Sequence, residues 1–71
     1  MPKSITVDRV KVISEMARQN VTGDELAAKA GVGRSAVQKV RKGQPVWRTT
    51  AGHIARALGV DVADLMAKGE D

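Results

Sequence analysis

The sequence predicts an all-α fold, a compact single domain of five short helices over residues 1–71. Apolar residues recur at spacings of three and four, which is the periodicity of an amphipathic helix. Residues that favour helix starts alternate along the chain with glycines that favour helix ends. No segment alternates apolar and polar residues over a useful strand length. The 71 residues correspond to one small domain.

The first helix is predicted over residues 7–19. Thr6 is the expected N-cap, and Asp8 favours the positive end of the helix dipole. One face of this helix is apolar because four side chains follow the 3–4 spacing: Val10, Ile13, Met16 and Ala17. We expect this face to be buried.

The second helix is predicted over residues 23–30. Thr22 and Glu25 match the capping box, in which each residue bonds the backbone of the other. Gly31 follows at the position where a left-handed residue commonly ends a helix.

The third helix is predicted over residues 34–41, with Gly33 at its N-cap. Because only a short turn separates it from the second helix, the two form a helix-turn-helix unit at about residues 22–43. Its outward face is polar and carries no acid: Arg34, Ser35, Gln38, Lys39 and Lys42.

Glycine, glutamine and proline predict a loop over residues 43–48. The fourth helix is predicted over residues 50–58 with Thr49 as its N-cap, and a last short helix follows from Asp61. The expected core consists of Val10, Ile13, Leu26, Ala27, Val32, Val37, Val40, Ile54, Leu58, Val60 and Leu65.

Charge is segregated along the chain, whose net charge is +4 and whose isoelectric point is near 10.0. Residues 26–60 contain seven basic residues and no acid, whereas the other five basic residues accompany all eight acids. A concentrated positive region favours an extended polyanion such as DNA.

Several classes of site are not expected. The chain has no cysteine, and His53 has no second histidine or nearby acid that would complete a metal site or a catalytic pair. We therefore expect no metal, no cofactor, no small-molecule ligand and no enzymatic activity. No apolar run approaches the roughly 18 residues of a membrane span, and no signal peptide begins the chain, so we expect a cytoplasmic protein.

Two segments, LAAKAGVGRSAVQKVRKG and IARALGVDVADLM, carry a resemblance to a known family. They resemble the Cro and phage-repressor type of helix-turn-helix DNA-binding domain, also called the XRE or lambda-repressor-like family, over about residues 5–66. Three positions depart from the family pattern. Gly23 replaces a common Gln, Gly33 a usual Ser or Thr, and Arg41 a common Glu.

The resemblance implies that helix 34–41 enters the major groove of double-stranded DNA. The implied base-contacting residues are Arg34, Ser35, Gln38 and Lys39. Arg and Lys can donate to guanine, and Gln can pair with adenine, although Lys39 could reach a phosphate instead. The implied phosphate-contacting residues are Thr22, Gly23, Lys42, Gln44 and Arg48.

The resemblance also implies a homodimer on DNA, with Val46, Trp47 and His53 as candidate interface residues. Trp47 is the only aromatic residue. We expect it to cap the core or to pack on helix 50–58, with a dimer contact or a sugar–phosphate contact as the alternative.

The sequence therefore predicts a DNA-binding transcriptional regulator of phage or bacterial type, a repressor that binds a palindromic operator. A second hypothesis is an antitoxin that regulates its own operon, although the tail after Met66 is short for wrapping a toxin. A third is a protein-interaction module that reuses the fold, and a fourth is an architectural protein that binds DNA without a discrete operator.

Overall fold

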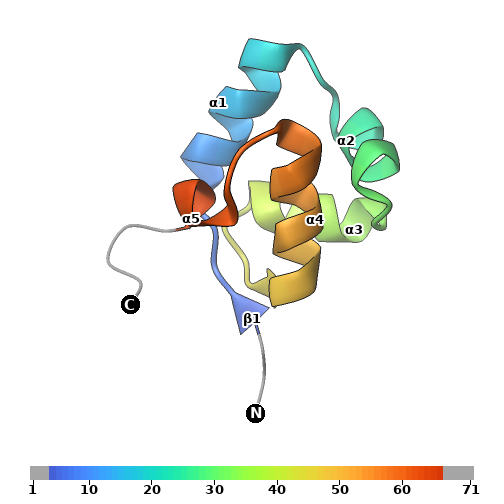
Figure 1. The fold of residues 1–71 in the computed structure, drawn as a ribbon. Helices are drawn as coiled ribbons and strands as arrows, with labels where there is room; N and C mark the ends of the chain where they lie inside the picture. Colours follow the sequence, from blue (N-terminus) through green and yellow to red (C-terminus); the bar gives the residue numbers. More distant parts are fainter. Residues whose placement is uncertain (1–3, 67–71) are drawn as a thin grey trace.

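The computed structural model describes residues 4–66. Its elements follow in the order β1 (Ser4–Ile5), α1 (Arg9–Gln19), α2 (Gly23–Ala30), α3 (Arg34–Arg41), β2 (Val46–Trp47), α4 (Arg48–Leu58) and α5 (Val62–Leu65). The predicted five-helix fold is confirmed. Figure 1 shows α4 in the middle of the domain, with α1 and α2 on either side of its upper part and α3 crossing near its lower part. The short tail after Met66, a weak candidate for toxin binding, lies outside the described residues.

Local sequence signals place α2 and α3 at their predicted bounds, but two helix starts differ from the prediction. Helix α1 begins at Arg9, because Oδ1 of Asp8 accepts a hydrogen bond from the backbone N–H of Val10 at 2.9 Å. Thr6 is therefore not the cap. Helix α4 begins at Arg48, directly after Trp47, so Thr49 lies inside the helix.

The predicted buried face of α1 is confirmed at Met16 but is wrong at Val10, Ile13 and Ala17. Val12 is fully buried and Met16 nearly so, whereas Val10 is 59% exposed and Ile13 is 39% exposed. The helix carries apolar residues on two overlapping faces, and the one that includes Val12 is turned toward the core. Val10 and Ile13 consequently leave an apolar patch on the surface.

The core surrounds α4. This helix contributes Ala51, Ile54, Ala55 and Leu58, and it contacts α1, α2, α5 and both strands. Within residues 4–66 no polar or charged residue is buried, so packing in the core is entirely apolar. The other buried side chains are Val7, Val12, Met16, Leu26, Ala27, Val37, Val40, Val46 and Leu65.

Two small strands, which the sequence did not predict, join distant parts of the chain. Strand β1 pairs antiparallel with β2, with Ser4 opposite Trp47 and Ile5 opposite Val46. Val7 then forms an isolated bridge with Met66, and the N–H of Asp8 donates to the carbonyl oxygen of Leu65 at 2.7 Å. Residues 4–8, called here the N-terminal strap, thus connect β2 to the end of α5.

Gln19 links the end of α1 to the end of α4. Its Nε2 donates to the carbonyl oxygen of Leu58 at 2.7 Å and to Oε1 of Glu15 at 3.1 Å. Hydrogen bonds from Arg18 and then from Gln19 lower the pKa of the Glu15 carboxyl below its ordinary value. The same carboxylate oxygen thus accepts hydrogen bonds from both Arg18 and Gln19.

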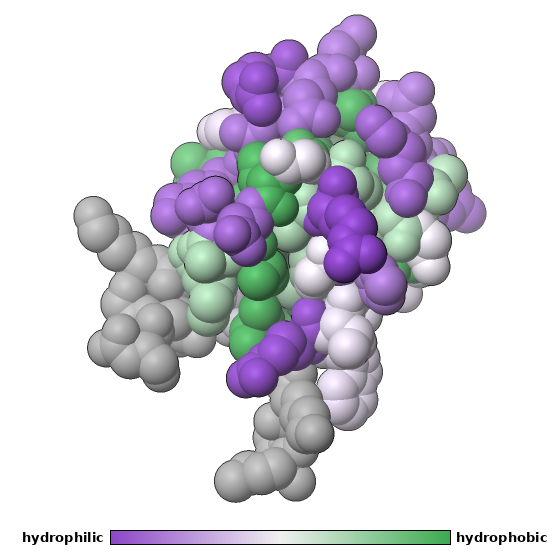
Figure 2. All heavy atoms as spheres, in the orientation of Figure 1, coloured by the Kyte–Doolittle hydropathy of each residue, from purple (hydrophilic) through white to green (hydrophobic). Residues whose placement is uncertain are grey.

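Polar side chains cover most of the margin of the face seen in Figure 1, and an apolar strip runs down its middle (Figure 2). Ala57, Val60 and Val62, from the end of α4 and the segment that follows it, are partly buried against the core. Within the described range, no helix is long and apolar enough to cross a bilayer.

The orientation of α1 leads to a prediction with a matched control. We expect Val12→Ala to lower the free energy of unfolding by about 2 kcal/mol, because it removes two buried methyl groups and leaves a cavity. Val10→Ala makes the same chemical change on the exposed face, so its effect should stay within about 0.5 kcal/mol. Urea denaturation followed by circular dichroism measures both. Equal losses from the two variants would contradict the orientation of α1.

Candidate nucleic-acid interface

The start of α2 is fixed by its own side chains. Oγ1 of Thr22 accepts from the N–H of Glu25 at 3.1 Å, and Oε1 of Glu25 accepts from the N–H of Thr22 at 2.8 Å. The predicted capping box is therefore confirmed. This pair satisfies two backbone donors, while the neighbouring N–H groups of the first turn remain free for an anion.

A tight turn sets the position of α3 relative to α2. Gly31 adopts the predicted left-handed conformation, with φ of 71°, and its N–H closes the end of α2. Helix α3 starts after Gly33, which has no side chain to cap it. Val37 and Val40 bury the inner face of α3, and this leaves its outer face in solvent.

The outer face of α3 forms a broad, open hollow. The hollow has a volume of about 580 Å³, and it is lined by Arg34, Ser35, Gln38, Lys39, Lys42 and Gln44. It brings together all four residues predicted to contact bases and two of those predicted to contact phosphates. All six side chains are polar, none is acidic, and all are exposed. Such a surface offers several hydrogen-bond donors to the edges of base pairs and to phosphates.

A smaller hollow of about 200 Å³ connects the start of α2 to the outer face of α3. Thr22 and Gly23, the other predicted phosphate contacts on α2, line it together with Arg34 and Gln38. The start of α2 and the outer face of α3 are therefore parts of one continuous surface, because Arg34 and Gln38 line both hollows.

Asp24 belongs to this surface, although it was not among the residues predicted from the sequence. Its Oδ1 lies 3.5 Å from Nη1 of Arg34, and both side chains are largely exposed. An exposed ion pair at this distance contributes little to stability. It does place a negative charge beside a residue expected to contact bases. A helix-turn-helix fold brings the first turn of α2 close to the first turn of α3. The predicted fold could therefore have indicated that Asp24 lies near Arg34.

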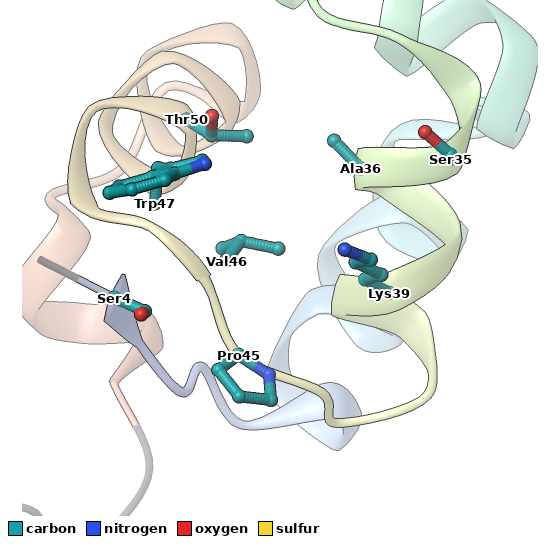
Figure 3. A pocket seen from close by; sticks show the side chains of 8 residues that line it. All are labelled: Ser4, Ser35, Ala36, Lys39, Pro45, Val46, Trp47 and Thr50. Atoms are coloured by element: carbon teal, nitrogen blue, oxygen red, sulfur yellow. The ribbon is translucent and has the colours of Figure 1, made fainter. Parts of the chain in front are cut away.

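Figure 3 shows a groove beside α3, with a volume of about 410 Å³. Ser35, Ala36 and Lys39 of α3 form one wall, and Val46, Trp47 and Thr50 form the other. Ser4 and Pro45 complete the lining. The indole of Trp47 thus lies across this groove from Ser35, Ala36 and Lys39 of α3.

The expected core packing of Trp47 is wrong, because 63% of the residue is exposed. Because successive residues of a strand point to opposite faces, β2 places Val46 inside and Trp47 outside. Val46 is only 6% exposed, so its side chain contributes to the core and offers little surface to a second subunit. Trp47 instead presents a large aromatic surface to solvent.

Arg48 and His53 lie apart from these hollows. Arg48 is the exposed first residue of α4, directly after Trp47, and His53 is exposed on the same helix. Neither residue lines the hollows around α3. The phosphate contact of Arg48 and the interface role of His53 stay predictions.

No group of three or more His, Asp or Glu side chains between residues 4 and 66 is arranged to hold a metal ion. The exposed outer face of α3 offers hydrogen-bond donors and positive charge. This chemistry is suited to recognising a polyanion whose base edges can be reached in a groove.

Comparison with protein families identifies the chain. A family model described as a Cro/C1-type HTH DNA-binding domain matches residues 11–68, which is most of the chain. Searches of curated proteins and of solved structures gave no match. The matched segment contains α2, α3 and α4, and therefore the whole surface described above except Ser4. The chain belongs to the family of Cro/C1-type helix-turn-helix DNA-binding domains.

Proposed function

We propose that this protein is a transcriptional repressor that binds a palindromic operator as a homodimer, with α3 of each subunit in the major groove. The observation that carries this proposal is the exposed outer face of α3, where Arg34, Ser35, Gln38 and Lys39 line one hollow to which no acid contributes. Membership of a DNA-binding family supports DNA as the partner. The chemistry of these four side chains supports recognition of the base sequence.

The proposed division of labour follows the position of each residue. Arg34 and Gln38 lie in both hollows and are the proposed base readers, with a guanine and an adenine as the bases that match their chemistry. Ser35 and Lys39 extend the contact toward the groove beside Trp47. The backbone at Thr22 and Gly23, together with Lys42, Gln44 and Arg48, would hold phosphates and fix the register of the helix.

A dimer is supported by size and by exposed apolar surface. The domain measures 32 × 21 × 19 Å, so two copies are small enough to occupy half-sites about 34–36 Å apart on one face of a duplex. Trp47 is the largest exposed apolar side chain in the described residues, and aromatic residues are enriched at interfaces. Together with the exposed His53 it forms the proposed contact. Repression would follow from occupation of promoter DNA.

The first experiment selects duplexes from a randomised pool at two salt concentrations and sequences them. We expect enrichment of a palindrome whose half-sites are separated by about one helical turn. In the same selection, Gln38→Ala should relax the preference at one position of each half-site, with a loss of roughly 1–3 kcal/mol for the preferred base. Lys42→Ala is the control, because removal of a phosphate contact should weaken binding to every sequence alike. Binding without enrichment, lost steeply with salt, would contradict operator recognition and favour an architectural role.

Asp24 leads to a prediction on affinity. We expect Asp24→Asn to strengthen binding to any duplex a few-fold at low salt, because it removes a negative charge from the DNA-facing surface and frees Arg34. The gain should fade as salt increases. Asp61→Asn makes the same change beside α5, in a hollow that includes no residue of α2 or α3, and should have little effect. Fluorescence anisotropy with a labelled duplex measures both variants. Weaker binding by Asp24→Asn would contradict this account of the acid.

The dimer prediction can be separated from a contact between Trp47 and DNA. We expect Trp47→Ser to reduce the cooperativity of binding to two half-sites, while binding to a single half-site stays unchanged. His53→Ala should act in the same direction and more weakly. Titrations of one-site and two-site duplexes measure this difference. An equal loss on both duplexes would indicate that Trp47 contacts the sugar–phosphate backbone instead.

A further inference from the structure

Arg41 is the last residue of α3, yet its guanidinium reaches back to the first residue of α2. It lines the small hollow together with Thr22, Gly23 and Arg34. Between residues 4 and 66 it forms no ion pair, and it is exposed. A long cationic side chain with no acidic partner among the described residues is thus held at the edge of the proposed DNA-facing surface.

The guanidinium of Arg41 lies close to the space that a side chain at position 23 would occupy if Gly23 were replaced. A Cβ atom on Gly23 would lie 3.0 Å from Nη1 of Arg41 and 3.8 Å from Cγ1 of Val37. The first distance is tighter than nine in ten real Cβ contacts, so even an alanine at position 23 would shift the end of Arg41 by a few tenths of an ångström, and a longer side chain would displace it further. The guanidinium is the flexible partner and would move, whereas Val37 is buried and fixed.

We propose that Arg41 is an additional phosphate-contacting residue of this protein, and that Gly23 is what gives it access to the DNA. The two residues then act as a pair: the absence of a side chain at position 23 allows a side chain from position 41 to take its place. This inference rests on the proposed DNA-binding surface.

The charges around the small hollow indicate what Arg41 would contribute to phosphate binding. Asp24 lies 3.5 Å from Arg34 and offsets part of its positive charge. Arg41 brings a second guanidinium to the same hollow and restores a positive balance where a phosphate would approach. A guanidinium also presents a planar set of donors that suits two phosphate oxygens at once.

The test measures affinity for a duplex of arbitrary sequence as a function of salt. Arg41→Gln should lower the slope of log affinity against log salt by about 1, and should weaken binding roughly five- to tenfold near 0.1 M salt. Arg56→Gln removes the same charge from α4, in a hollow that includes no residue of α2 or α3, and should leave the slope nearly unchanged. An unchanged slope for Arg41→Gln would overturn the inference.

A double-mutant cycle tests the pairing of the two positions. Gly23→Leu should displace Arg41 and weaken binding at least as much as Arg41→Gln. In the Arg41→Gln background it should cause a smaller loss, because only its effect on the backbone contact at position 23 then remains. Independent, additive losses would overturn the pairing. Thermal denaturation of each variant confirms that the fold is retained, because leucine favours a helix more than glycine does.

The same binding experiments distinguish a failure of the proposed function from a failure of this inference. If the wild-type protein binds no duplex at either salt concentration, the DNA-binding surface itself is contradicted. If the wild-type protein binds and Lys42→Ala lowers the slope while Arg41→Gln does not, DNA binding stands and only the role of Arg41 is overturned.

Discussion

Burial of the apolar face of α4 is the constraint on which the rest of the structure depends. This helix lies in the middle of the domain and contacts α1, α2 and α5 as well as both strands. Two of its buried residues are alanines, Ala51 and Ala55, and their small side chains allow close packing of neighbouring elements. Every other helix of the described chain contributes at least one buried apolar residue to the same core. Because a chain of this size buries a limited area, few of these contacts are dispensable.

This arrangement separates stability from recognition within α3. The inner residues, Val37 and Val40, are held in the core, whereas the outer residues contribute little to packing and are free to meet a ligand. The backbone of α3 is thereby positioned before any ligand binds, and only side-chain freedom remains to be lost on binding. The surface is also less uniform in charge than the sequence suggests, because folding brings Asp24 next to Arg34.

The parts of the fold that follow from local chemistry could be predicted from the sequence, and the parts that follow from tertiary packing could not. Thr22, Glu25 and Gly31 fix the ends of α2 through contacts within a few residues, and both bounds agree with the prediction. Helix α1 has apolar residues on two overlapping faces, so only its packing against the rest of the domain selects Val12 over Val10. Strands of two residues have no periodicity to detect.

The candidate site divides in the same way. The six residues of the large hollow come from one helix and the turn after it, so their common surface follows from helical spacing. The approach of Arg41 to Gly23 joins the end of one helix to the start of another, and no sequence pattern encodes that distance. The exposure of Trp47 depends on the register of β2 against β1, which places its neighbour Val46 in the core instead.

The N-terminal strap has a consequence for the order in which the domain folds. Its pairings join residue 4 to residue 47 and residue 7 to residue 66, whereas α2 and α3 meet across a turn of a few residues. Closing a long loop costs more chain entropy than closing a short one, so contacts of high sequence separation tend to form late. The helix-turn-helix unit is therefore expected to assemble early, and the strap to dock after it. During synthesis, α2 and α3 would be complete before Leu65 and Met66, the partners of Asp8 and Val7, have emerged.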